Sequence, residues 1–96
     1  MRLLYDTMLR EPVMWVHAAM PYQYAESAVQ DLVARGAEIE EVDWMLSLPV
    51  IRAKAQLRRL LGYPQALAAL SQNTADLRMW LSHYAPVAPE LGGDAA

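Results

Sequence analysis

The chain has 96 residues, enough for one domain around a single hydrophobic core. It contains no cysteine, which excludes a disulfide framework, a thiolate metal site and a cysteine nucleophile. The formal net charge of −3 argues against a general binder of nucleic acid or anionic membranes. The apolar fraction is 55%, above the roughly 45–50% typical of soluble domains. This excess indicates either self-association or a partner that covers apolar surface, or a dense helical core, and the sequence leaves both open.

The first half of the chain predicts helices rather than strands, because apolar residues recur every three or four positions between prolines and glycines. A short helix is expected over 2–9, and one or two further turns after Pro12. The segment 21–35 predicts an amphipathic helix that ends before Gly36. The segment 38–47 predicts another, because its acidic residues suit a helix N-terminus.

The second half continues the same pattern. A helix is expected over 50–61, after Pro49 restarts the chain, and a last helix over 64–84 with a break at 71–74, where poor helix formers gather. These elements predict an all-α fold, a compact bundle of about five short helices. The predicted domain covers residues 1–85, and residues 86–96 are expected to form a flexible tail.

Catalytic and metal-binding patterns are missing from the sequence. His17 and His83 lack a second ligand three or four positions away, and no glycine-rich phosphate loop is present. The acidic segment 38–43 lacks the glycine and the spacing of a calcium loop. We therefore expect no enzyme activity, no metal and no cofactor.

Aromatic and methionine residues mark the first candidate interaction surface. The chain has three Trp, five Tyr and six Met but no Phe, and Trp, Tyr and Met are enriched at protein interfaces. The densest cluster comprises Met14, Trp15, Met20, Tyr22 and Tyr24. The same cluster could instead be a patch of the core, and the sequence leaves both interpretations open.

Opposed charges mark the second candidate surface. Four acidic residues lie within 38–43 and four basic residues within 52–59. The segments can pair with each other within the chain, or they can steer a partner electrostatically. The candidate binding residues in them are Glu40, Glu41, Arg52, Lys54, Arg58 and Arg59.

The stretch 28–62 resembles the three-helix core of bacterial helix-turn-helix DNA-binding domains, through AVQDLVARG, AEIEEVDWMLSLP and VIRAKAQLRRLLG. The resemblance implies that the helix Val50–Leu61 lies against DNA. The sequence departs from that pattern at Asp43, where a small buried residue is expected, and in a turn without glycine.

The function that the sequence predicts is a small, non-catalytic protein-binding module: an adaptor, inhibitor or regulatory factor of bacterial or phage origin. We expect a cytoplasmic protein that binds another protein and forms a homodimer, with no membrane association. DNA binding through Val50–Leu61 is the alternative function.

Overall fold

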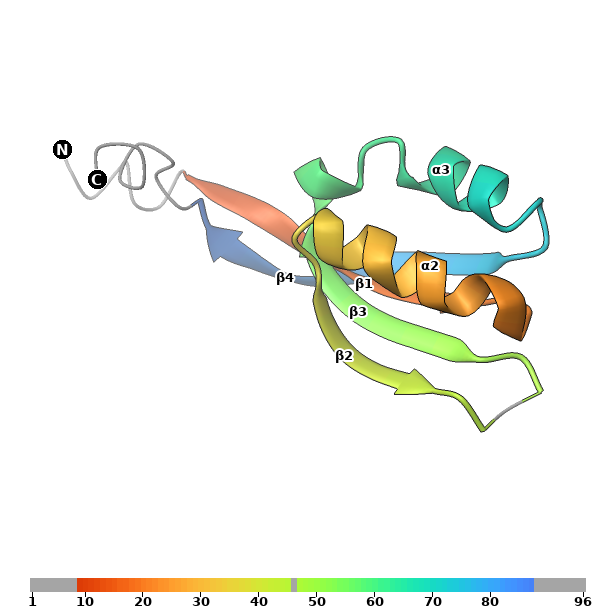
Figure 1. Ribbon diagram of the computed structural model, residues 1–96. Coiled ribbons are helices and arrows are strands. Elements are labelled where there is room, and N and C mark those ends of the chain that lie inside the picture. The colour runs from red at the N-terminus through yellow and green to blue at the C-terminus, as the bar shows by residue number, and fades with distance from the viewer. Residues whose placement is uncertain (1–8, 46, 88–96) are drawn as a thin grey trace, which may run out of the picture.

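The computed structural model describes residues 9–45 and 47–87. These ranges contain four β-strands and two α-helices in the order β-α-β-β-α-β, with a short 3₁₀ helix between the third strand and the second α-helix (Figure 1). In chain order the elements are β1 (Arg10–Ala19), α2 (Tyr22–Ala34), β2 (Glu38–Asp43), β3 (Val50–Gln56), η1 (Leu57–Leu60), α3 (Tyr63–Leu70) and β4 (Asp76–Pro86).

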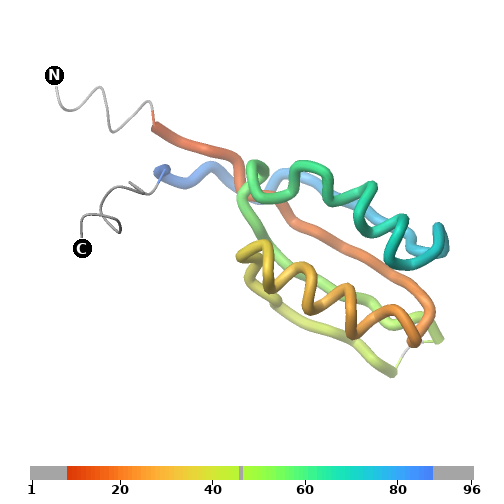
Figure 2. Tube along the Cα trace, turned by 45° about the horizontal axis from the view of Figure 1, so that its top comes forward, coloured from red at the N-terminus to blue at the C-terminus, as the bar shows by residue number. Residues whose placement is uncertain are grey.

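The strands form one antiparallel sheet in the order β2-β3-β1-β4. Both helices lie on the same face of this sheet, as two views of the chain show (Figures 1 and 2). The connections β1–α2–β2 and β3–α3–β4 each pass over a strand of the other unit, which is the arrangement of two interlocked split β-α-β units. The opposite face of the sheet carries no helix in the described part of the chain.

The predicted all-α bundle is therefore wrong, and so is the predicted recognition helix. The segment Val50–Gln56 is the strand β3, and η1 supplies only a short 3₁₀ turn after it. The buried residues Ile51, Ala53 and Ala55 alternate with polar ones, which is the period of a strand. The sequence nevertheless favours a helix in this segment, because alanine, arginine, lysine and glutamine all favour helices in isolation.

The turns predicted after Pro12 and the helix predicted over 38–47 fall instead on the strands β1 and β2. In β1 the positions that face away from the core carry Trp15 and His17, so hydrophobicity does not alternate along the strand. In β2 the register shifts between Ile39 and Glu41, which places the inward-facing Ile39 and Val42 three positions apart. Three-residue spacing imitates a helix.

Other predictions are confirmed. The helix expected over 21–35 is α2, and Gly36 follows it in the left-handed conformation with φ +85°. The break expected at 71–74 follows α3, and Gln72 and Asn73 in it both have positive φ.

The element after this break is the strand β4, so the helix predicted up to residue 84 is wrong beyond the break. The helix predicted over 2–9 and the tail predicted from residue 86 lie outside the described residues, except for Leu9, Pro86 and Val87.

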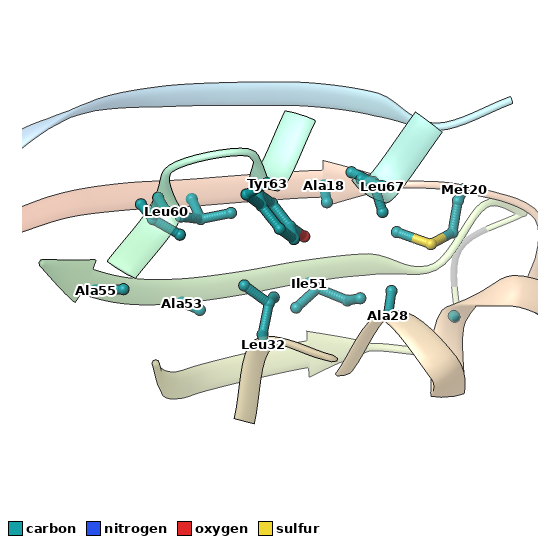
Figure 3. Packing of buried hydrophobic residues seen from close by; sticks show 12 residues of the cluster. Ala18, Met20, Ala28, Leu32, Ile51, Ala53, Ala55, Leu60, Tyr63 and Leu67 are labelled. Carbon is teal, nitrogen blue, oxygen red and sulfur yellow. The ribbon is translucent and has the colours of Figure 1, made fainter. Parts of the chain in front are cut away.

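The core lies between the two helices and the covered face of the sheet (Figure 3). Small side chains dominate the sheet side of this layer, and larger ones from the helices fill the space above them. Close packing of this kind leaves few voids. The fully or almost fully buried apolar residues are Val16, Ala18, Met20, Ala25, Ala28, Leu32, Ile51, Ala53, Ala55, Leu60, Tyr63 and Leu67.

Tyr63 places a polar atom inside this core. Its hydroxyl is buried and has no hydrogen-bond partner among residues 9–45 and 47–87. Burial, assisted by the charge of Asp31 and opposed by that of Arg35, raises the pKa of Tyr63 to about 12. Arg35 lies 5.2 Å from the centre of the Tyr63 ring and donates hydrogen bonds to the carbonyl oxygens of Arg59 and Leu61, both at 3.3 Å.

We predict that Tyr63→Phe keeps or raises the stability of the domain at neutral pH, because it removes an unsatisfied buried hydroxyl whose desolvation costs about 1–3 kcal/mol. A tyrosine whose pKa is raised on folding releases its proton first in the unfolded state, so stability falls as the pH rises from 10 to about 12. Tyr63→Phe should reduce that alkaline loss, measured by urea unfolding across this pH range.

Tyr84→Phe is the matched control, because the Tyr84 side chain is exposed. It should leave both the neutral stability and the alkaline loss unchanged. A destabilisation of Tyr63→Phe by more than about 1 kcal/mol would mean that the hydroxyl is satisfied in the folded protein.

Candidate functional site

The sheet face opposite the helices is the candidate functional site, and we call it the open face. Its side chains follow from the pairing of the strands, because residues directly opposite each other in a sheet point to the same side. Three rows run across the four strands in the order β2, β3, β1, β4. They are Glu38–Lys54–Trp15–Trp80, Glu41–Arg52–His17–Arg78 and Asp43–Val50–Ala19–Asp76.

Aromatic rings occupy the β1 and β4 side of the open face. Trp15 and Trp80 are direct partners across these two strands. His17 meets the Trp80 ring edge-on, with 4.7 Å between the ring centres. The Lys54 ammonium lies 5.0 Å from the centre of the Trp15 ring, at a distance suited to a cation–π contact. This part of the sheet therefore offers flat π surfaces, one of which already holds a cation.

Acidic residues occupy the β2 side. Arg52 pairs with Glu41, and the Lys54 ammonium lies 3.9 Å from the Glu40 carboxylate. The irregular register of β2 allows the consecutive residues Glu40 and Glu41 to face the same side of the sheet. These contacts confirm that the oppositely charged segments 38–43 and 52–59 pair within the chain, and at half-exposed sites such pairs contribute little stability.

A shallow groove of about 470 Å³ joins the aromatic and the acidic parts of the open face. Trp15 and Trp80 provide its apolar lining, and both acidic and basic side chains provide its polar lining. The full lining consists of Trp15, His17, Glu40, Glu41, Arg52 and Trp80.

The electrostatics of the groove act on His17. Partial burial lowers the pKa of its imidazole, and the positive charges of Arg52 and Arg78 lower it further. The imidazole is consequently neutral at pH 7 and presents an uncharged ring beside Trp80.

The structure brings together five of the predicted interaction residues, namely Trp15, Glu40, Glu41, Arg52 and Lys54, on the open face. It separates the others. Met20 is fully buried in the core, and Met14 and Tyr24 pack against it. Tyr22 lies on α2, exposed beside Trp44, with 5.4 Å between the ring centres.

The two remaining predicted residues lie on η1, away from the groove. Arg58 donates a hydrogen bond of 2.9 Å to the Glu11 carboxylate, which ties η1 to β1. The Arg59 side chain packs against Gly36, so closely that a Cβ at position 36 would lie 3.2 Å from Arg59 Cδ. The cluster between residues 14 and 24 is divided between two elements, because Met14 and Trp15 are consecutive residues of β1 that point to opposite faces, whereas Tyr22 and Tyr24 lie on α2.

Six charged or aromatic residues of the open face are not among the predicted interaction residues: His17, Glu38, Asp43, Asp76, Arg78 and Trp80. For the three on β4 the signal is the alternation of the strand, where Leu77 and Met79 pack against the core between the outward-facing Asp76, Arg78 and Trp80. The same residues also fit the apolar stripe of a helix.

Within the ranges 9–45 and 47–87, no group of three His, Cys, Asp or Glu side chains could hold a metal ion. None of the helices described there is both long and apolar enough to span a membrane.

Comparison with known proteins connects the fold to a family. The family model described as "Elongation factor G C-terminus" matches residues 8–94. The chain belongs to the elongation factor G C-terminus family. Elongation factor G of Pseudothermotoga lettingae is 40% identical over 76 residues, a match that covers 79% of this chain and 11% of the relative. Elongation factor G of Thermotoga maritima is 35% identical over 83 residues, covering 86% and 12% respectively.

A solved structure agrees with these sequence matches. A crystal structure of a Thermus thermophilus protein superposes with a TM-score of 0.78 at 28% identity, over 88% of this chain and 13% of that one. The chain thus spans about an eighth of the length of its relatives. Membership of the family overturns the predicted adaptor, inhibitor or regulatory protein and the predicted helix-turn-helix regulator.

We predict that Arg78→Gln raises the pKa of His17 towards its ordinary value of 6.5, because it removes one of the two positive charges that oppose protonation. Arg52→Gln should raise it too, because it removes the other of these two positive charges. The double variant should remain below 6.5, because burial is the largest cause. The measurement is an NMR titration of the assigned His17 imidazole.

Arg59→Gln is the control, because Arg59 lies on η1 beside Gly36. It should leave the His17 titration where it is. An unchanged His17 pKa in both Arg78→Gln and Arg52→Gln would contradict the electrostatics described for the open face.

Proposed function

We propose that the chain acts as the C-terminal domain of an elongation factor of the G type and contributes to translation elongation on the ribosome. The observation that carries this proposal is the family match over residues 8–94, nearly the whole chain. The superposition with the Thermus thermophilus structure supports it independently, because it compares coordinates as well as sequence.

The proposed role is binding rather than chemistry. The relatives are about eight times longer than the matched segment, so most of the factor's machinery lies in their other parts. The open face offers aromatic and charged side chains arranged across a sheet. Such a surface suits recognition, since a rigid sheet holds its side chains in place.

The proposed partner is the ribosome, and the proposed location is the cytoplasm, where elongation takes place. A homodimer, which the sequence alone suggested, has no support in the family match. The open face is proposed to contact the ribosome or another part of the same factor.

A domain exchange tests the proposal. This chain would replace the matching C-terminal segment of the Pseudothermotoga lettingae factor, and the chimera would be assayed for polypeptide synthesis in a reconstituted translation system. We predict that the chimera supports synthesis well above a factor truncated before that segment, because the exchanged domain keeps the same fold.

Circular dichroism and thermal unfolding of the chimera serve as the folding control. A chimera that folds, yet is as inactive as the truncated factor, would contradict the proposed role. Co-sedimentation with ribosomes provides a second readout, in which the chimera should pellet and the truncated factor should pellet less.

A further inference from the structure

The open face has more acidic than basic side chains, although it lies on a sheet with exposed tryptophan. Five acidic residues from the two edge strands point to it, against three basic ones from β3 and β4. The acidic residues are Glu38, Glu40, Glu41, Asp43 and Asp76, and the basic residues are Arg52, Lys54 and Arg78. The face is therefore negative, and its negative charge is concentrated along the β2 edge.

Ion pairing leaves part of this negative charge uncompensated. Glu40 and Glu41 have basic partners on β3. Glu38, Asp43 and Asp76 form no ion pair within the described ranges of the chain. A ligand that brings positive charge would complement these carboxylates, whereas a polyanion such as RNA would be repelled by them.

The aromatic part of the face already shows how a cation fits. The Lys54 side chain lies over Trp15 and reaches the Glu40 carboxylate at the same time, so a π face and a carboxylate bind one ammonium together. Trp80, the partner of Trp15 on the neighbouring strand β4, offers a second aromatic ring, and it is 43% exposed. A guanidinium could stack on Trp80 in the same way.

We propose that the open face binds a basic polypeptide segment, in an extended conformation across the strands, whose arginine or lysine side chains stack on Trp80 and pair with the carboxylates of β2. The proposal rests on the proposed function, because it assigns this face to a protein partner of the elongation factor rather than to RNA. Charge complementarity selects the occupant, and the row Glu38–Lys54–Trp15–Trp80 gives its path.

The test uses the whole chain and a fluorescently labelled peptide of alternating arginine and serine. The peptide has about eight residues, which exceeds the roughly 15 Å between β2 and β4 when extended. Binding is followed by fluorescence anisotropy at low salt, and an otherwise identical peptide of alternating glutamate and serine serves as the charge control. We expect the arginine peptide to bind, the glutamate peptide not to bind, and added salt to weaken the arginine complex.

Variants locate the binding site. Trp80→Ala should weaken binding by about two- to tenfold, as loss of one cation–π contact does. Glu38→Gln should weaken it by about two- to fivefold, as loss of one exposed charge pair does. The matched controls are Trp44→Ala and Glu26→Gln, which remove the same two side-chain types from the exposed group beside Tyr22. These controls should bind as the parent chain does.

Three outcomes would overturn the proposal: no binding of the arginine peptide, equal losses in the control variants, or tighter binding of a uridine oligonucleotide than of the arginine peptide. The domain-exchange assay is separate from this titration. An active chimera together with absent peptide binding would reject the basic partner and keep the translation role, whereas peptide binding with an inactive chimera would reject the translation role.

Discussion

Burial of one face of the sheet is the constraint on which the rest of the structure depends. Two helices of 13 and 8 residues cover four strands from one side, and the described part of the chain places no helix on the other side. The covered side is lined with alanine, which lets α2 and α3 lie close to the strands and lets Tyr63 and Leu67 fill the layer. The uncovered side is then free to carry residues that no core would accept, such as Glu41 and Arg52.

The open face combines three features that follow from this arrangement. Because paired residues of neighbouring strands point to the same side of the sheet, chemically different side chains align in rows across it. Because β2 is an edge strand, its carboxylates meet solvent, and only Glu40 and Glu41 find basic partners. Because His17 is partly buried and lies between two arginines, its pKa is lowered and its ring is uncharged at pH 7 beside Trp80. The result is a rigid surface with an aromatic part and an acidic part.

The sequence predicted α2, its glycine terminus and the break before β4, since these depend on local signals that proline, glycine and three-to-four spacing provide. It did not predict the sheet. In β3 the strand period is present but is carried by alanine, arginine and lysine, which favour helices. In β2 an irregular register moves Val42 to a helix-like spacing from Ile39. Pairing with distant strands decides whether such segments become strands.

For the same reason the sequence predicted only part of the candidate site. The chemistry of the side chains indicated Trp15, Glu40, Glu41, Arg52 and Lys54. Trp80 and Arg78 were not predicted, because only strand pairing brings them to the same face.

The central claim is that the open face is the surface with which this elongation factor domain meets a basic protein partner. The most direct test places a photo-crosslinking benzoylphenylalanine at Trp80 in the chimeric factor bound to ribosomes, with the same substitution at Glu26 as the comparison. The account predicts crosslinks from position 80 to a lysine- or arginine-rich protein segment, identified by mass spectrometry, and few from position 26. Crosslinks from position 80 to ribosomal RNA, or from position 26 alone, would contradict it.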